Sequence, residues 1–123
     1  MTAYPDSELT RSIIGAAFEV HNILGTGFLE KVYRNALVKE LRLQGIQVQS
    51  EAQIPVHYKD ELVGDYYADI LVDGRIILEL KALNTLTKEH EAQLPNYLKA
   101  TGHKIGLLLN FGTNKVQVKR KIL

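Results

Sequence analysis

Three charged residues in the middle of the chain have the types and spacing of a hydrolytic metal site. Asp69 precedes the pair Asp73-Gly74, and Glu79 and Lys81 follow it with one residue between them. Carboxylate oxygens are the ligands that Mg²⁺ and Mn²⁺ prefer, and such an ion neutralises phosphate charge and lowers the pKa of bound water. A lysine beside the ion can hold the attacking water. The same short pattern also occurs in surface salt-bridge clusters, so the residues alone leave both interpretations open.

The pair Asp73-Gly74 predicts a tight turn between two strands, at 66–72 and 75–81. We expect a three-residue loop, 72–74, with Gly74 left-handed and Leu71 paired with Arg75. A two-residue loop would mix apolar and polar side chains on both faces of the hairpin. The three-residue loop instead gathers the even-numbered apolar residues on one face: Ala68, Ile70, Ile76, Leu78 and Leu80.

The opposite face of this hairpin is then polar and exposed, and it carries Asp69, Glu79 and Lys81 together with Ile77. In this register Asp69 and Glu79 are diagonal neighbours, with Cα atoms about 7–8 Å apart. Hydrophobic patterning therefore predicts that two carboxylates and one lysine converge, close to a strand carbonyl.

The rest of the chain supplies elements that can position this hairpin. Apolar residues at three- and four-residue spacing predict a helix over 7–24, capped by Asp6 or Ser7, and a second helix that ends at Gly45. Alternation predicts an extended segment over 46–58, irregular at Ser50-Glu51 and at a sheet edge because of Pro55. A third helix is expected from Thr85 or Thr87 to about 100, followed by an internal strand at 105–110 and a basic strand at 116–122. The order ααβββαββ indicates an α/β (α+β) domain with a mixed sheet.

Composition limits the classes of protein that this chain can represent. With 123 residues it suits one domain, 1–123, and without cysteine it has no disulfides and no thiolate zinc site. No apolar run reaches the roughly 20 residues of a membrane span, and the N-terminal residues lack a secretory signal pattern, so we expect a cytoplasmic protein without membrane contact. Residues 92–123 contain six Lys or Arg and no Asp or Glu, which suits either phosphate binding or a solvated edge strand. The candidate phosphate-binding residues are Lys115, Lys119, Arg120 and Lys121.

Asp69 followed by Glu79-Leu80-Lys81 after a hairpin resembles the core motif of the PD-(D/E)XK nuclease superfamily. The segment Gly27-Phe28-Leu29-Glu30-Lys31-Val32-Tyr33 resembles the signature of one branch, the GxxExxY proteins. The resemblance extends through GAAFEVHNILGTGFLE, YADILVDGRIILELKAL, EAQLPNYLKATG and IGLLLNFG, and so covers nearly the whole chain. It implies a restriction-endonuclease-like fold, in which helices flank a mixed β-sheet.

The resemblance also implies roles for individual residues. Asp69, Glu79 and the carbonyl of Leu80 would bind Mg²⁺ or Mn²⁺, Lys81 would be the catalytic lysine, and Glu30 would approach the same metal. Gln93 and Tyr97 match a Gln-xxx-Tyr helix motif beside the active site. Spacing alone allows Glu30 to be a first-turn residue paired with Arg34, and allows Tyr97 to be a core tyrosine. Pro95, between Gln93 and Tyr97, predicts a kink or a displaced helix start.

These observations lead to three hypotheses about function. The first is a Mg²⁺-dependent phosphodiesterase that cleaves nucleic acid, DNA in preference to RNA, and that could act as a homodimer. The second is a catalytically silent module that retains the fold and binds nucleic acid or protein. The third is a hydrolase of nucleotides or other small molecules. An assay of DNA, RNA and nucleotides with Mg²⁺ or Mn²⁺ discriminates between them.

Overall fold

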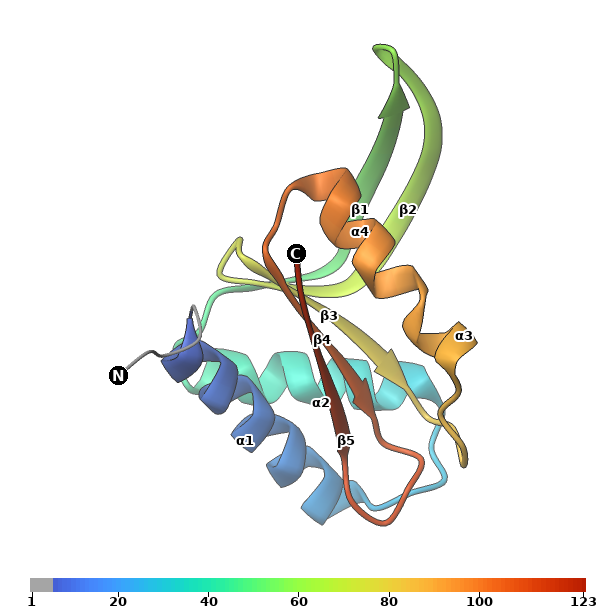
Figure 1. Ribbon diagram of the computed structural model, residues 1–123. Coiled ribbons are helices and arrows are strands. Elements are labelled where there is room, and N and C mark those ends of the chain that lie inside the picture. The colour runs from blue at the N-terminus through green and yellow to red at the C-terminus, as the bar shows by residue number, and fades with distance from the viewer. Residues whose placement is uncertain (1–5) are drawn as a thin grey trace, which may run out of the picture.

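The computed structural model describes residues 6–123, which form one five-stranded sheet in the order β1-β2-β3-β4-β5 (Figure 1). The first five residues of the N-terminal segment, where we expected no secretory signal, lie outside the described residues. The neighbouring strands β3 and β4 are parallel and the other neighbours are antiparallel. This confirms the mixed sheet. The strands are β1 (Val48–Tyr58), β2 (Glu61–Val72), β3 (Ile76–Lys81), β4 (Ile105–Asn110) and β5 (Gln117–Ile122).

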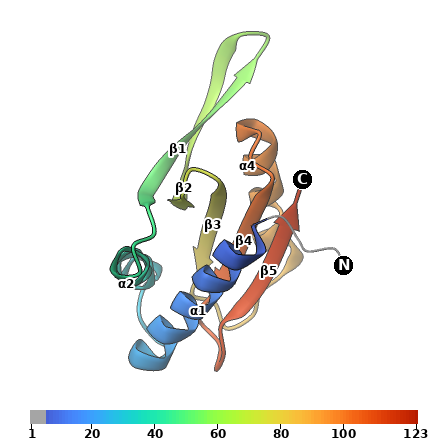
Figure 2. The same ribbon diagram turned by 90° about the vertical axis from the view of Figure 1, so that its left-hand side faces the viewer.

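The helices α1 (Ser7–Leu24) and α2 (Glu30–Leu43) lie where the apolar spacing predicts them. Their buried stripes pack on one face of the sheet and form the larger core, which includes Ile13, Tyr33, Leu37, Leu78 and Leu107. A smaller core on the other face joins Ile77 and Leu108 to the apolar side of helix α4. The sheet is therefore covered on both faces, with α1 seen across β4 and β5 in Figure 2. Within residues 6–123 no helix combines the length and apolarity that crossing a membrane would require.

The expected side-chain cap of the first helix is wrong. Asp6 is the residue before α1 but has a left-handed backbone, with φ 56°, and neither it nor Ser7 makes a capping hydrogen bond. Its carboxylate instead pairs with Arg75 at the turn between β2 and β3. A long-range ion pair has replaced the local bond that the sequence suggested.

The turn between β2 and β3 has three residues, as expected, but it is displaced by one position. Val72 pairs with Ile76, so the loop is Asp73-Gly74-Arg75, and Asp73 as well as Gly74 is left-handed, with φ 52° and 65°. The expected pairing of Leu71 with Arg75 is therefore wrong. Because the displacement moves the pairing by an even number of residues, the side chains keep their faces, and Ile70, Ile76, Leu78 and Leu80 share the larger core.

Strands β1 and β2 continue beyond the sheet as a two-stranded arm, residues 53–67, that runs past α4 and away from α1 and α2 (Figure 1). β1 is an edge strand that contains Pro55, as predicted. The expected irregularity is at Glu51, whose φ is 54°, and the pairing passes from Ser50–Ile70 to Ala52–Ala68 around it. Beyond this point Ala68 packs in the smaller core and not with Ile70, which corrects the expected face of Ala68. The left-handed Glu51 interrupts the ladder between β1 and β2, and the local twist there leaves Ile70 and Ala68 in different cores.

The single helix expected after β3 is divided in two, α3 (Lys88–Glu91) and α4 (Gln93–Thr101), with Ala92 between them. Pro95 lies in the first turn of α4, where the backbone N–H groups have no partner within the helix, so the ring is tolerated there. The displaced helix start that Pro95 predicted is thus confirmed. Thr87 and His90 cap α3 reciprocally.

Candidate active site

The two carboxylates lie where β2 and β3 separate. Regular pairing of these strands extends only from Val72–Ile76 to Ile70–Leu78. Past that point side chains replace the ladder: the Leu80 amide donates to Asp69 Oδ2 at 2.7 Å, and the Asp69 amide donates to Glu79 Oε1 at 3.4 Å. Asp69 and Glu79 therefore face each other across the gap, and are closer in register than the diagonal neighbours we expected.

This face of the hairpin is covered and not exposed as predicted. Glu79 retains only 8% of its accessible surface, and Asp69 and Lys81 are half-buried, because Leu94 and Tyr97 of α4 pack on the same face beside Ile77. Burial, reinforced by the charge of Asp69, raises the pKa of Glu79 to about 8. Burial also raises the pKa of Asp69, although the Leu80 amide, Arg34 and Lys81 act against the rise. The carboxylates of the site thus carry more negative charge than Lys81 and Arg34 neutralise.

The segment from Gly25 to Tyr33 positions Glu30 at this site. Gly27 has φ 104°, a conformation that glycine adopts without strain, and the Tyr33 hydroxyl donates to the Gly25 carbonyl at 2.6 Å while its ring stacks on Phe111. These contacts fix the start of α2, where Glu30 is the first residue. The pKa of Glu30 is raised by partial desolvation and by Asp69, and lowered by Lys81 and Arg34. Glu30 therefore joins the carboxylate group.

Lys81 lies at the end of β3, and its ammonium lowers the pKa of all three carboxylates. Its backbone carbonyl accepts a hydrogen bond from the Phe111 amide at 2.8 Å, which continues the contact between β3 and β4. One lysine thus faces the three carboxylates Asp69, Glu79 and Glu30.

Arg34 is a residue of the site that the sequence interpretation missed. Helix spacing predicts it only as a partner of Glu30, but its guanidinium pairs with Glu51 at 2.9 Å and lowers the pKa of Asp69 as well as that of Glu30. The Arg34 Nε atom is buried and has no hydrogen-bond partner. Its position one helical turn after Glu30 was the signal that could have placed it beside the carboxylates.

Gln93 and Tyr97 lie side by side along one wall of a cavity of about 580 Å³. Tyr97 is buried, and its pKa is raised to about 12 by burial and by the charges of Glu79 and Asp69. Gln93 is exposed at the mouth. Tyr97 is thus near the carboxylates, whereas Gln93 shares the cavity with it and starts α4 after the break at Ala92.

Asn110 is a second residue that was missed, because it ends a strand that otherwise reads as apolar. It is fully buried and bonds both backbone groups of Leu83, the Gly112 amide and the Gln117 side chain. A Cβ on Gly112 would lie 2.3 Å from the Leu83 carbonyl oxygen. This cross-tie holds the chain that leaves β3 just after Lys81.

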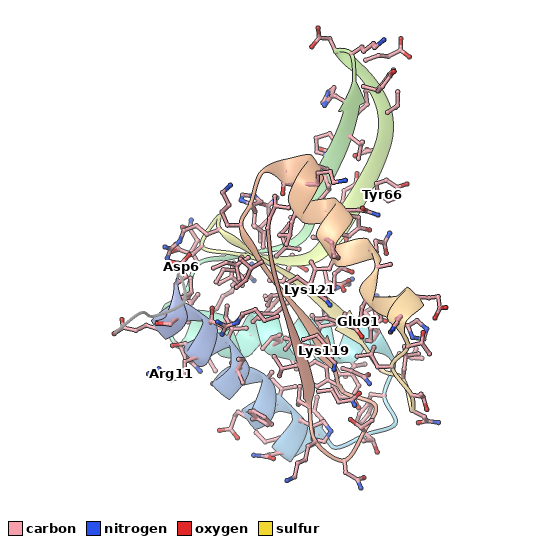
Figure 3. The ribbon with its side chains drawn as sticks, in the orientation of Figure 1. Asp6, Arg11, Tyr66, Glu91, Lys119 and Lys121 are labelled. Carbon is pink, nitrogen blue, oxygen red and sulfur yellow. The ribbon has the colours of Figure 1, made fainter. Side chains whose placement is uncertain are left out.

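The basic residues near the C-terminus do not form one surface. Lys119 is opposite Leu108, which is opposite Glu79, so Lys119 shares the face of the carboxylates, two strands away. Lys121 shares that face but bonds Glu91 of α3 at 2.8 Å (Figure 3). Arg120 is opposite Leu107 and so lies on the α1 side of the sheet, and Lys115 is in the loop before β5.

The donor set fits a divalent cation that keeps part of its water shell. Among residues 6–123, no three His, Cys, Asp or Glu side chains form a ready metal cage. Asp69 and Glu79 are nevertheless fixed by backbone amides, and Glu30 stands at the same site with a raised pKa. Mg²⁺ is usually bound through one or two carboxylates and several waters, which is the number of fixed carboxylates present here.

Comparisons with known proteins identify the fold and the family. The chain resembles the crystal structure of SSO0001, with a TM-score of 0.57, 18% identity and 95% of this chain covered, but it spans only 59% of that protein. It also resembles an alkaline exonuclease, LHK-Exo from Laribacter hongkongensis, with a TM-score of 0.54 and 13% identity, over 99% of this chain and 72% of the exonuclease. At such identities the likeness shows the fold alone. No curated protein matches the sequence. The family model of the PD-(D/E)XK nuclease superfamily matches residues 7–121, and the chain therefore belongs to that superfamily.

Proposed function

We propose that the protein is a divalent-metal-dependent nuclease that hydrolyses phosphodiester bonds, with DNA as its preferred substrate. The observation that carries this proposal is the group formed by Asp69, Glu79 and Glu30 around Lys81 where β2 and β3 separate. Membership of the nuclease superfamily supports the same activity. The segment from Gly27 to Tyr33 supports a place in the GxxExxY branch.

In this proposal Asp69, Glu79 and the Leu80 carbonyl hold Mg²⁺ or Mn²⁺, with Glu30 as a further ligand directly or through water. The ion, when bound, neutralises phosphate charge and lowers the pKa of water. Lys81 orients the attacking water and stabilises negative charge on the phosphoryl oxygens as the transition state forms. The backbone amides of Leu80 and Asp69 keep the two strand carboxylates turned toward the gap.

The test compares Asp69→Asn and Lys81→Ala with the unsubstituted protein, on single- and double-stranded DNA, RNA and nucleotides, with Mg²⁺ or Mn²⁺. We expect both variants to lose cleavage by at least 100-fold. Asp69→Asn keeps an acceptor for the Leu80 amide but loses its ligand charge, so Mn²⁺ binding by calorimetry weakens. Lys81→Ala still binds Mn²⁺, as tightly or more tightly, because a competing positive charge is gone.

Asp65→Asn is the matched control, because Asp65 is an exposed carboxylate on β2, the strand that carries Asp69. Its side chain accepts a hydrogen bond from the Gln53 side chain in the arm. It should cleave and bind Mn²⁺ normally. If the unsubstituted protein binds no divalent ion at millimolar concentration, or if Lys81→Ala cleaves normally, the nuclease proposal is wrong. Nucleic-acid binding without cleavage would then favour a catalytically silent module.

A further inference from the structure

A cavity of about 580 Å³ separates α4 from the β1–β2 arm, and its volume is in the range of ligand sites. One wall comes from α4 and the other from the arm, which projects from the sheet beside this helix (Figure 1). The lining residues are Val56, His57, Tyr66, Gln93, Asn96, Tyr97, Lys99 and Ala100.

The cavity adjoins the carboxylates. Tyr97 lines it and packs in the smaller core with Ala68, the residue before Asp69. Tyr66 lies three residues before Asp69 on β2, a separation of about 10 Å along a strand. A ligand bound between Tyr66 and Tyr97 is therefore a neighbour of a phosphate held at Asp69 and Glu79.

Tyr66 offers an aromatic surface to this cavity. It is paired with Ile54, which belongs to the smaller core, so its side chain is on the α4 side (Figure 3). Its ring centroid is 5.7 Å from that of Tyr97, with 45° between the planes, and 47% of the residue stays exposed.

The polar groups around the cavity suit a nucleotide. Gln93 and Asn96 carry amides that both donate and accept hydrogen bonds, as the edges of bases require. Lys99 and His57 are basic, and the lining contains no acidic side chain that would repel a phosphate. An aromatic face next to amides and a cation is the usual combination for an unstacked base.

We propose that this cavity binds one unstacked base of a single strand, by stacking on Tyr66, and so holds the nucleotide next to the bond that is cut. This inference rests on the proposed nuclease function and adds a substrate class to it: single-stranded or frayed DNA in preference to a continuous duplex. A base inside a duplex is stacked and paired, and reaching a lateral cavity would require its extrusion.

The test measures the binding of two labelled single strands, with EDTA present to prevent cleavage. One is an oligothymidylate of twelve nucleotides, and the other is the same backbone with abasic sites. We expect Tyr66→Ala to lower affinity for the oligothymidylate roughly ten-fold and to change affinity for the abasic strand by less than two-fold. Tyr66→Phe retains the aromatic face and should bind like the unsubstituted protein, with thermal melts showing that each variant is folded.

Tyr67→Ala is the matched control, because Tyr67 is the adjacent exposed tyrosine, is paired with Gln53 on the other face of the arm and does not line the cavity. It should bind both oligonucleotides normally. If Tyr66→Ala and Tyr67→Ala behave alike, or if Tyr66→Ala weakens both strands equally, the base site is wrong while metal-dependent cleavage by the unsubstituted protein can stand. If Tyr66→Ala acts only on the base-bearing strand but nothing is cleaved with Mg²⁺ or Mn²⁺, the base site stands and the nuclease proposal falls.

Discussion

At the scale of single residues, the site is dominated by carboxylates that are brought together without enough positive charge. Glu79 is the extreme case, because it is almost fully buried and faces Asp69. Each of these groups would be more stable in the unfolded chain, where water solvates its charge. This unfavourable free energy of desolvation arises where a bound divalent cation would offset it.

The raised pKa of Glu79 predicts how the stability of the metal-free protein depends on pH. Between the ordinary carboxyl pKa and about 8, the folded protein holds a proton that the unfolded chain has released. The free energy of unfolding should therefore fall as pH rises from about 5 to 8. Urea unfolding in EDTA across this range should show a flatter dependence for Glu79→Gln, which keeps an acceptor for the Asp69 amide.

Glu19→Gln, a substitution of an exposed carboxylate on α1, is the control and should follow the unsubstituted protein. Saturating Mg²⁺ should oppose the fall, because the ion binds the deprotonated site. Parallel pH dependences of Glu79→Gln and the unsubstituted protein would show that Glu79 does not carry the raised pKa.

Arg34 leads to a second prediction at this scale. Its charge lowers the pKa of Asp69 and of Glu30, so Arg34→Met should let both carboxyls hold their protons to higher pH. Since metal binding needs deprotonated ligands, the onset of Mn²⁺ binding should move to higher pH. Calorimetry at several pH values measures the shift, and Arg42→Met on the exposed part of the same helix should show none. An unmoved onset in Arg34→Met would contradict the role given to this arginine.

At the scale of elements, the site depends on how chain segments leave the sheet. β2 bends away from β3 at Asp69, and the chain after β3 is held by Asn110, at the end of the neighbouring parallel strand. Glu30 is held by the loop that Tyr33 anchors. Glu30 and Lys81 are thus at the end of an element, and Asp69 and Glu79 lie where the pairing of β2 with β3 stops.

The cross-tie at Asn110 predicts a large loss of stability on substitution. Asn110→Ala leaves the half-buried Leu83 and Gly112 backbone groups without their Asn110 partner, and should lower the free energy of unfolding by roughly 2–4 kcal/mol. Asn114→Ala, in the exposed part of the next loop, should change it by no more than about 0.5 kcal/mol. Urea unfolding of the two variants provides the comparison, and equal stabilities would mean that Asn110 does not hold this junction.

At the scale of the whole molecule, the sheet separates two environments. The α1 and α2 side is the larger core, and the other side carries Glu79, the cavity and Lys119. Glu79 and Lys119 are in one row across the sheet, about 10 Å apart at the usual strand spacing. A nucleic-acid strand at the carboxylates could therefore contact β5 only through residues of that face.

This arrangement changes the expected salt dependence of DNA binding. Lys119→Ala should lower the slope of log affinity against log salt by about one unit, because one phosphate contact is lost. Adding Arg120→Ala should lower it no further, since Arg120 lies on the α1 side of the sheet. Fluorescence anisotropy over a salt series measures both slopes.

Arg11→Ala is the control: it removes a cation from the exposed side of α1 and should leave the salt dependence unchanged (Figure 3). A fall of about two units for the Lys119 and Arg120 double variant would instead support a phosphate-binding surface formed by the whole strand, which was the expectation from charge alone.

The features that depend on local periodicity could be predicted from the sequence. The two helices, the internal strand at 105–110 and the common face of Asp69 and Glu79 follow from side-chain spacing, because the period of a helix or strand is set by the backbone itself. Pro95 likewise predicted the displaced start of α4, since proline is disfavoured in the interior of a helix and tolerated in its first turn.

Only the tertiary structure decided the outcome where a local sequence signal competes with a contact between distant residues. Asp6 pairs with Arg75 instead of capping α1, and Lys121 bonds Glu91 instead of remaining available to a phosphate. The burial of Glu79 under α4, the approach of Arg34 to Asp69 and the cavity beside Tyr66 all depend on how elements pack across the sheet. Such contacts join residues far apart in the chain, so no periodicity within a single segment can specify them. The chain by itself determined which residues could share a face, and the packing of the faces determined their charge, their burial and their neighbours.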